Sequence, residues 1–265
     1  MLYFVATPIG NLKDISYRAI EVLSSVDIIA CEDTRNSLKL LLHYDIKKEL
    51  IAYHKFNERN SAEGIIKLLK QGKNIAVISD SGMPVISDPG NILVQRLIEE
   101  ELEYTVVPGA NAGLSALLLS GFDAKRFTFV GFLPDTKERK ELLNEISKYF
   151  TTLIFYISPH SLKKDIEDIY RSLGDRRACL VNEITKLYEK TIFFNLSEKL
   201  DIEERGEYVL VVDAKQKTND FMSLTIDEHI EYYIEQGLDK KEAIKQVAKD
   251  RKLAKSEIYK HTINN

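Results

Sequence analysis

The sequence has few of the residues that mark fibrous, disordered or disulfide-stapled chains. Its 265 residues include 12 glycines, 6 prolines and 2 cysteines, while 44% of the residues are hydrophobic and 29% are charged. Such a composition can bury a core, which excludes an intrinsically disordered chain and a collagen-like repeat. Cys31 and Cys179 lie far apart in the sequence and fit neither a disulfide framework nor a metal site. We therefore expect a cytoplasmic protein.

Long apolar runs and targeting signals are also missing. The sequence has no run of about 18 apolar residues, the length that a membrane-spanning helix needs. The first residues, MLYFVATPIG, contain no basic segment. We expect neither a transmembrane helix nor a secretory signal, and no membrane partner. A chain of this length suits two domains of ordinary size.

Three motifs of common nucleotide-binding and hydrolytic enzymes are absent. No G-x-G-x-x-G follows an expected strand, and neither G-x-x-x-x-G-K-[ST] nor G-x-S-x-G occurs. A dinucleotide-binding Rossmann domain, a P-loop nucleotidase and a simple serine hydrolase are therefore unsupported. The five histidines lack the spacing of metal ligands, so we expect no metal site; they are His43, His54, His160, His229 and His261.

The formal net charge of −4 argues against a chain that coats nucleic acid by bulk charge. The charge is unevenly distributed, however. Residues 1–120 carry 12 basic and 15 acidic side chains, whereas residues 239–265 carry eight basic and four acidic ones. A solvated helix face explains such a run as readily as a local basic patch does, so charge alone leaves both interpretations open.

Short apolar runs alternate with helical periods through the first 120 residues. We expect strands over residues 2–6, 28–31, 51–53, 74–79 and 104–107. Between them, apolar spacing predicts helices around residues 15–23, 38–42, 65–69, 93–98 and 112–119. Continuous apolar strands that alternate with helices are typical of a parallel sheet covered on both faces.

The second half repeats this pattern and then gives way to helices alone. Strands are expected over 127–132, 152–157, 178–182 and 207–212, and helices over 137–149, 160–173, 226–236, 239–250 and 255–262. The turn between the last two helices resembles a helix-turn-helix. We predict an N-terminal α/β domain over 1–120, a second α/β domain over 121–221 and a basic helical unit over 222–265.

Proline and glycine gather where the expected strands end. The first strand is followed by TPIGN, the strand over 74–79 by DSGMPVISDPG, and the strand over 104–107 by PGANAG. Ligands of open α/β sheets bind beyond the carboxyl ends of the strands. Glycine allows close backbone approach there, and proline stiffens the loop. The three loops therefore predict a pocket for a flat, polar small molecule.

Two polar runs that follow expected strands contain candidate catalytic side chains. CEDTRNS (31–37) places Glu32, Asp33 and Arg35 at the start of a helix, where a helix cap explains Asp33 equally well. Glu183 and Lys186 follow the strand over 178–182, where a surface ion pair is the alternative explanation.

Taken in order, these motifs resemble the tetrapyrrole methylase superfamily. The resemblance spans nearly the whole chain and rests on TPIGNLKDIS (7–16), EDTR (32–35), SDSGMPVISDPG (79–90), VPGANA (107–112), GFLP (131–134), the FY of FYISPH (155–160) and EITK (183–186). It implies two α/β domains with a cleft between them that binds S-adenosyl-L-methionine, and a homodimer. The chain is most similar to the branch that methylates a cytidine ribose 2′-hydroxyl in the decoding region of 16S rRNA, within the small ribosomal subunit.

Together with loop position and the basic segment, the resemblance suggests roles for individual residues. Expected donor contacts are Pro8, Ile9, Gly10, Asp80, Gly82, Met83, Asn111, Ala112, Gly113 and Tyr156. Expected catalytic residues are Glu32, Asp33 and Lys186, which would accept or weaken the hydroxyl proton, and Arg35, which would clamp a phosphate or carboxylate. Expected substrate contacts are Asn11, Glu183, Lys249, Arg251, Lys252 and Lys255. The family usually has other residues at the positions of Met83, Asn111, Ile157 and Asn182.

Two other functions are compatible with parts of the sequence. One is methylation of a tetrapyrrole or another small molecule, which would not need a basic helical unit. The other is a DNA-binding regulator whose α/β part senses a ligand. The elaborate loops at the strand ends favour an enzyme over a DNA-binding regulator.

Overall fold

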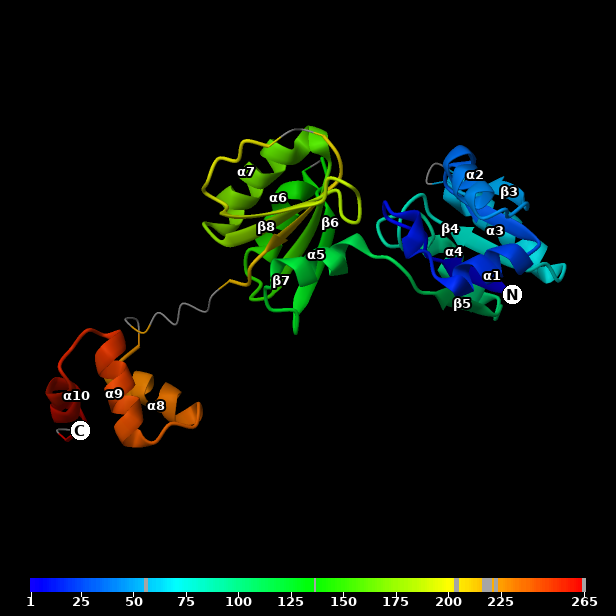
Figure 1. Cartoon of the computed structure of the whole chain (residues 1–265). Coiled ribbons are helices and arrows are strands. Elements are labelled where there is room, and N and C mark those ends of the chain that lie inside the picture. The colour runs from blue at the N-terminus through cyan, green and yellow to red at the C-terminus, as the bar shows by residue number, and fades with distance from the viewer. Residues whose placement is uncertain (55–56, 136, 203–204, 216–220, 222–223, 264–265) are drawn as a thin grey trace. The chain divides into compact units, whose positions relative to one another are not determined.

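The computed structural model describes residues 1–54, 57–135, 137–202, 205–215, 221 and 224–263 (Figure 1). It divides into two compact units, Met1–Lys215 and Gln216–Asn265. The first unit contains two five-stranded sheets with their helices, and the second is helical. The predicted fold class, two α/β parts followed by a small helical unit, is confirmed.

The first sheet is entirely parallel. Its strands are β1 (Leu2–Val5), β2 (Ile28–Cys31), β3 (Glu49–Ala52), β4 (Ile75–Ile78) and β5 (Tyr104–Val107), in the spatial order β3-β2-β4-β1-β5. The ends of β2, β4, β1 and β5 therefore lie side by side at one edge of the sheet. Because the strands are parallel, the loops that follow them leave from the same edge. This order brings the EDTR, SDSG, TPIG and PGAN segments together.

Helices cover both faces of the first sheet. They are α1 (Tyr17–Ser25), α2 (Thr34–His43), α3 (Glu58–Lys70) and α4 (Asn91–Glu99). One core joins the sheet to α3 and α4 through residues such as Phe4, Ile65 and Leu97, and another joins it to α1 and α2 through Leu23 and Leu41. The strands thus bury both of their faces, as their continuous apolar runs predict.

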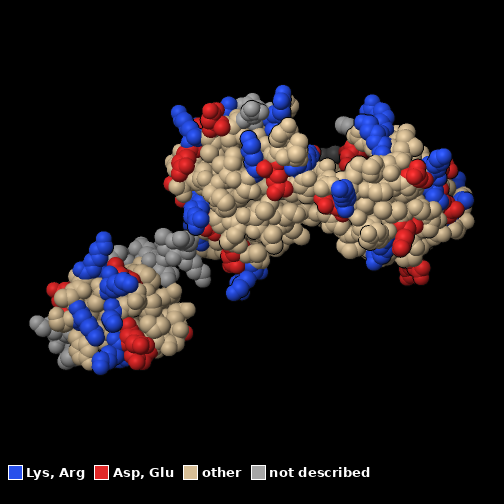
Figure 2. Space-filling model, in the orientation of Figure 1, with Lys and Arg blue, Asp and Glu red and all other residues tan. Residues whose placement is uncertain are grey.

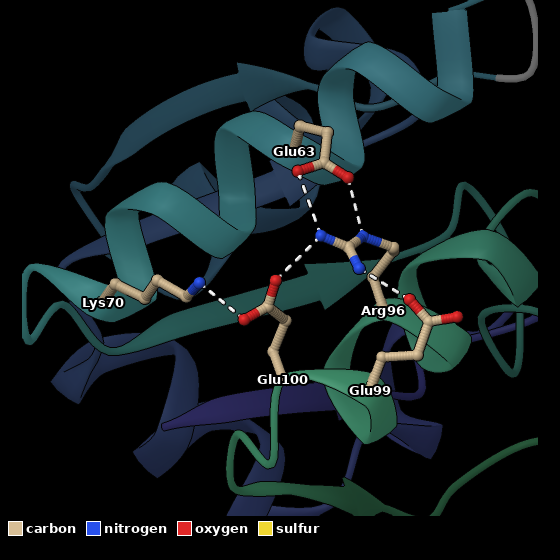
Figure 3. Close-up of polar contacts among 5 residues, drawn as sticks. All are labelled: Glu63, Lys70, Arg96, Glu99 and Glu100. Carbon is tan, nitrogen blue, oxygen red and sulfur yellow. Dashed lines mark hydrogen bonds and ion pairs between the residues drawn. The ribbon is translucent and has the colours of Figure 1, made fainter.

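A network of ion pairs fixes α3 against α4 (Figure 3). The Arg96 guanidinium donates hydrogen bonds to Glu63 at 2.7 Å, Glu99 at 2.6 Å and Glu100 at 2.9 Å. Glu100 also accepts a hydrogen bond from the Lys70 ammonium at 2.6 Å. Because these charges share one network, they constrain the two helices more than an isolated surface pair would.

The second sheet is mixed and therefore differs from the first. Its strands are β6 (Phe127–Phe132), β7 (Thr152–Ile157), β8 (Arg177–Asn182), β9 (Lys190–Asn195) and β10 (Tyr208–Val212), in the order β6-β7-β10-β8-β9. Only β6 and β7 pair in parallel. Strand β9, which forms an antiparallel hairpin with β8, was not predicted from the sequence. A connection of seven residues, 183–189, is too short for a parallel crossover and favours the antiparallel arrangement.

Three helices pack against the second sheet: α5 (Ala112–Ser120), α6 (Glu138–Ile146) and α7 (Leu162–Leu173). Short 3₁₀ helices lie at Leu12–Asp14 and Pro159–Ser161. Helix α5 precedes the predicted boundary at residue 121 but packs on the second sheet through Ala116 and Leu117. The boundary at 120/121 stays a prediction, and the one at 221/222 falls beside residues outside the described ranges.

The helical unit consists of α8 (Ile226–Glu235), α9 (Lys240–Asp250) and α10 (Lys255–Ile263) around a small core of its own. A capping box at Thr225 and Glu228 starts α8. The His229 ring is fully buried and stacks on Phe221 at 3.9 Å between centroids. None of the described α-helices is long and apolar enough to cross a membrane.

Arg251 has a structural role inside this unit. Its Nε donates a hydrogen bond to His229 Nδ1 at 3.1 Å, and one terminal nitrogen donates to the carbonyl oxygens of Phe221, Leu224 and Thr225. The interaction with Nδ1 requires an unprotonated nitrogen there. Burial, and then the Arg251 charge, hold the pKa of His229 below its ordinary value, although Asp250 opposes the shift.

We expect the helical unit to lose stability in acid. The folded state disfavours protonation of His229, so this contribution is complete above the ordinary pKa of about 6.5 and is lost as the pH falls through that value toward the lower folded pKa. Amide exchange of α8 and α9 in the full-length protein, corrected for intrinsic rates, should show easier opening at pH 5.5 than at pH 8. His229→Gln, which can still accept from Arg251, should reduce this difference; equal opening of the wild type at both pH values would contradict the prediction.

Candidate active site

Loops from both sheets of the first unit enclose a cavity of about 370 Å³. One part of its wall comes from residues before position 113: Ile9, residues 80–83 and 86–88, Asn111 and Ala112. The other part comes from residues of the second sheet and its loops: Phe132, residues 156–159, Ile184 and residues 207–209. Apolar side chains with a few converging polar groups are typical of small-molecule sites.

The loop from Ser79 to Gly90 is held in an unusual backbone conformation. Val85 and Ser87 have φ values of 74° and 68°, a region that side chains other than glycine rarely adopt. An added Cβ at Gly90, whose φ is 147°, would lie 2.5 Å from Cγ2 of Val85. Strained backbone of this kind persists only where the surroundings enforce it, and it is concentrated at functional sites.

Asp80 ties the end of β4 to the start of α2. Its Oδ1 accepts a hydrogen bond from the Asp33 backbone N–H at 3.3 Å, and its Oδ2 accepts one from the Asn36 amide at 3.0 Å. Asp80 therefore fixes the EDTR segment relative to the cavity that it lines. A carboxylate at the N-terminus of a helix is also favoured by the helix dipole.

A second cavity of about 330 Å³ adjoins the first, because Ile9, Asp80, Ser81 and Glu207 line both. Its remaining lining residues come from the loop after β1, from α2 and from the loop after β8: Thr7, Pro8, Gly10, Leu12, Asn36, Lys39, Leu40 and Lys186. Two adjacent cavities of this size can hold two reactants side by side.

Lys186 lies across Gly10 in the wall of the second cavity. An added Cβ at Gly10 would lie 2.6 Å from Cγ and 2.8 Å from Cε of Lys186, so only glycine allows this approach. The Lys186 ammonium pairs with Glu183 at 3.0 Å and with Glu207 at 2.8 Å. Partial burial opposes the charge, but the two carboxylates outweigh it and raise the pKa of Lys186.

The comparisons with known proteins agree with this geometry. The sequence profile of the family described as Tetrapyrrole (Corrin/Porphyrin) Methylases matches residues 1–200. The chain belongs to this family.

Bacterial relatives match the chain over most of its length. The protein named Ribosomal RNA small subunit methyltransferase I of Halalkalibacterium halodurans is 43% identical, over 97% of this chain and 93% of its own. The protein of the same name from Bacillus subtilis is 43% identical, over 98% of this chain and 92% of its own.

A solved structure shares the fold. The uroporphyrin-III C-methyltransferase of Thermus thermophilus, crystallised with S-adenosylhomocysteine, has a TM-score of 0.56 and 17% identity, over 80% of this chain and 96% of that chain. At this identity the similarity concerns the fold alone.

Most of the predicted donor contacts of this methylase lie at the first cavity. Seven of them line it: Ile9, Asp80, Gly82, Met83, Asn111, Ala112 and Tyr156. Gly113 donates its N–H to the Tyr156 hydroxyl at 3.3 Å. Pro8 and Gly10 line the second cavity instead. Their roles as donor contacts stay predictions.

The predicted catalytic residues are more dispersed. Lys186 lines the second cavity, whereas Glu32, Asp33 and Arg35 are not among the lining residues of either. Asp33 caps α2 and accepts two hydrogen bonds from the Arg35 side chain, at 2.8 and 3.1 Å. These bonds, with the Arg35 backbone N–H, lower the pKa of Asp33 to about 2.

The predicted substrate contacts lie in both units. Asn11 caps the 3₁₀ helix after β1, and Glu183 binds Lys186. Lys249, Lys252 and Lys255 are exposed on the helical unit. Figure 2 shows several basic side chains on the visible face of this unit, with acidic ones beside them.

Asp88 was not among the predicted site residues. It lies in the first cavity, where burial, and then the charges of Glu32 and Asp80, raise its pKa to about 7. Its position in the SDPG motif was a signal for it, but its environment depends on the fold. Ser87 and Glu207 also line the cavity without having been predicted.

We expect Asp88 to make donor binding depend on pH. The carboxyl is ionised above about pH 7 and neutral below it, and an ionised carboxylate favours the cationic sulfonium of S-adenosylmethionine. Affinity measured by calorimetry should fall by up to about tenfold from pH 8 to pH 6, following the ionised fraction. Asp88→Asn serves as the control, because the ligand's own titration is common to both proteins. The same pH dependence in the variant would refute this role.

Proposed function

We propose that the chain transfers the methyl group of S-adenosylmethionine to the 2′-hydroxyl of a cytidine in the decoding region of 16S rRNA, within the small ribosomal subunit. The observation that carries the proposal is the pair of adjoining cavities lined by the family's motif residues. It occurs in a family member whose full-length relatives are named small-subunit ribosomal RNA methyltransferases. We also propose a cytoplasmic location, since the substrate is ribosomal.

The first cavity suits S-adenosylmethionine chemically. Phe132, Ile157 and Val209 offer apolar contact for an adenine ring, and Asp80 and Asp88 offer negative charge to the sulfonium and ammonium groups. When bound, the donor supplies an electrophilic methyl carbon. The protein's contribution is to hold the reactants in line and to exclude water.

The helical unit supports an RNA substrate. Lys249, Lys252 and Lys255 are exposed and belong to the most basic segment of the chain. Lysines of this kind bind phosphates without reading base sequence. A porphyrin-like acceptor would make no use of them, which disfavours the small-molecule alternative. The ligand-sensing regulator finds no support in a chain whose relatives are enzymes.

A homodimer is part of the proposal. The second sheet and helix α5, which packs on it, expose large apolar side chains, including Leu114, Leu118 and Phe193. Leu118 and Leu187 are 80% and 88% exposed. Large apolar side chains as exposed as these are typical of a protein interface, and a second copy of the chain is the occupant that we propose.

Methyl transfer from tritiated S-adenosylmethionine tests the reaction. We expect label in 16S rRNA when isolated 30S subunits are the acceptor, and nuclease digestion should recover it as 2′-O-methylcytidine. Naked rRNA, duplex DNA and a tetrapyrrole are the comparison acceptors. Label on the macrocycle, on DNA or on a base atom would refute the proposed reaction.

We expect the basic surface to contribute to RNA affinity but not to donor affinity. Replacing Lys249, Lys252 and Lys255 by alanine should weaken RNA binding and reduce the dependence of log Kd on log salt by roughly 2, if each lysine contacts one phosphate. Donor affinity should be unchanged, because none of the three lines the cavity.

The matched control replaces three exposed lysines of the first unit, Lys140, Lys148 and Lys164, by alanine. This variant removes the same charge from another surface. If this control lowered the salt dependence of Kd as much as replacement of Lys249, Lys252 and Lys255 did, RNA binding would depend on net charge. The helical unit would then not be the contact.

A further inference from the structure

Glu207 lies where the two cavities meet. It directly precedes β10 and lines both cavities, as do Ile9, Ser81 and Asp80. Of the two carboxylates in this set, Asp80 has both oxygens engaged by α2. Glu207 has only Oε2 engaged, by Lys186 at 2.8 Å. Within the described residues, no donor forms a hydrogen bond with its Oε1, and the side chain is 69% exposed.

The predicted proton acceptors are less suitably placed. Lys186 pairs with two carboxylates that raise its pKa, so it keeps its proton and can only donate hydrogen bonds. Asp33 is engaged by Arg35, and neither Asp33 nor Glu32 is among the residues that line the two cavities. A base must lie within hydrogen-bond reach of the hydroxyl in a plausible substrate position.

We propose that Glu207 accepts the proton of the acceptor hydroxyl during methyl transfer, an inference that rests on the proposed function. The bond from the ribose 2′-oxygen to the methyl carbon forms as the sulfur–methyl bond breaks. The electron pair of the broken bond stays on sulfur, which loses its positive charge. The proton passes to Oε1 of Glu207, and the products are a neutral methyl ether, a thioether and a neutral carboxyl group.

A carboxylate is a sufficient base for this reaction. The 2′-oxygen gains positive charge as its bond to the methyl carbon forms, so its proton becomes strongly acidic in the transition state. The position of the proton acceptor then matters more than its basicity.

Lys186 and Glu183 act in this arrangement as positioning residues. The Lys186 ammonium donates a hydrogen bond to Oε2 of Glu207. Oε1 therefore stays available to the acceptor hydroxyl. Glu183 Oε1 accepts one hydrogen bond from the Lys186 ammonium and one from the Glu207 backbone N–H, each at 3.0 Å. The start of β10 and the side chain that precedes it are therefore fixed by the same carboxylate.

Single-turnover methylation of 30S subunits by Glu207→Gln tests the inference. The amide keeps the size of the side chain but is a much weaker base, so the rate should fall by about 100-fold or more. Donor and RNA affinities should stay within about twofold, as expected when a group acts only in the transition state. Glu198→Gln is the matched control, because Glu198 is an exposed carboxylate of the same half that lines neither cavity.

Chemical rescue separates a base from a structural group. Glu207→Ala leaves space beside Lys186, and added formate should restore part of its rate in a concentration-dependent way while having no effect on the wild type. Undiminished rate in Glu207→Gln, a loss of RNA affinity equal to the loss of rate, or no rescue by formate would each overturn the inference. If the wild type labels the 2′-oxygen in those cases, the proposed function stands without it; if the wild type does not label it, both fall.

Discussion

The contact of Lys186 with Gly10 is the constraint on which the arrangement of the site depends. It joins the loop after β1 of the first sheet to the loop after β8 of the second, and it forms part of the wall of the second cavity. The aliphatic stem of Lys186 occupies the space where any other residue at position 10 would carry a side chain. The ammonium can lie in this confined place because two carboxylates compensate its charge.

The carboxylates around the cavities differ because their surroundings differ. Arg35 keeps Asp33 ionised far into acid, and donors from α2 occupy both oxygens of Asp80. Burial, and then neighbouring negative charges, raise the pKa of Asp88 to about 7. Groups of one chemical type thereby acquire separate roles, since the environment and not the residue type sets the ionisation state.

The sequence predicted those features that local pattern determines. Apolar runs located nine of the ten strands that the described residues form, and Asp33, for which the sequence also suggested a helix cap, caps α2. Strand β9 was missed because KTIFFN begins with polar residues, follows a polar run and is mostly exposed, so its pairing with β8 decides its conformation. Glu207 was missed for a related reason: a single acidic residue before a strand carries no pattern, and its place between two cavities arises from the order of the second sheet. Arg251, an expected substrate contact in the basic segment, donates to three backbone carbonyls and a buried histidine, which its place in the sequence does not reveal.

The separate core of the helical unit has a consequence for how the chain unfolds. Within the described residues, six buried apolar side chains form the core of that unit. A core this small gives little stability and little cooperativity with the remainder of the chain. We therefore expect calorimetry on the intact protein to show a sum of at least two transitions, so that a single melting temperature would not describe both units.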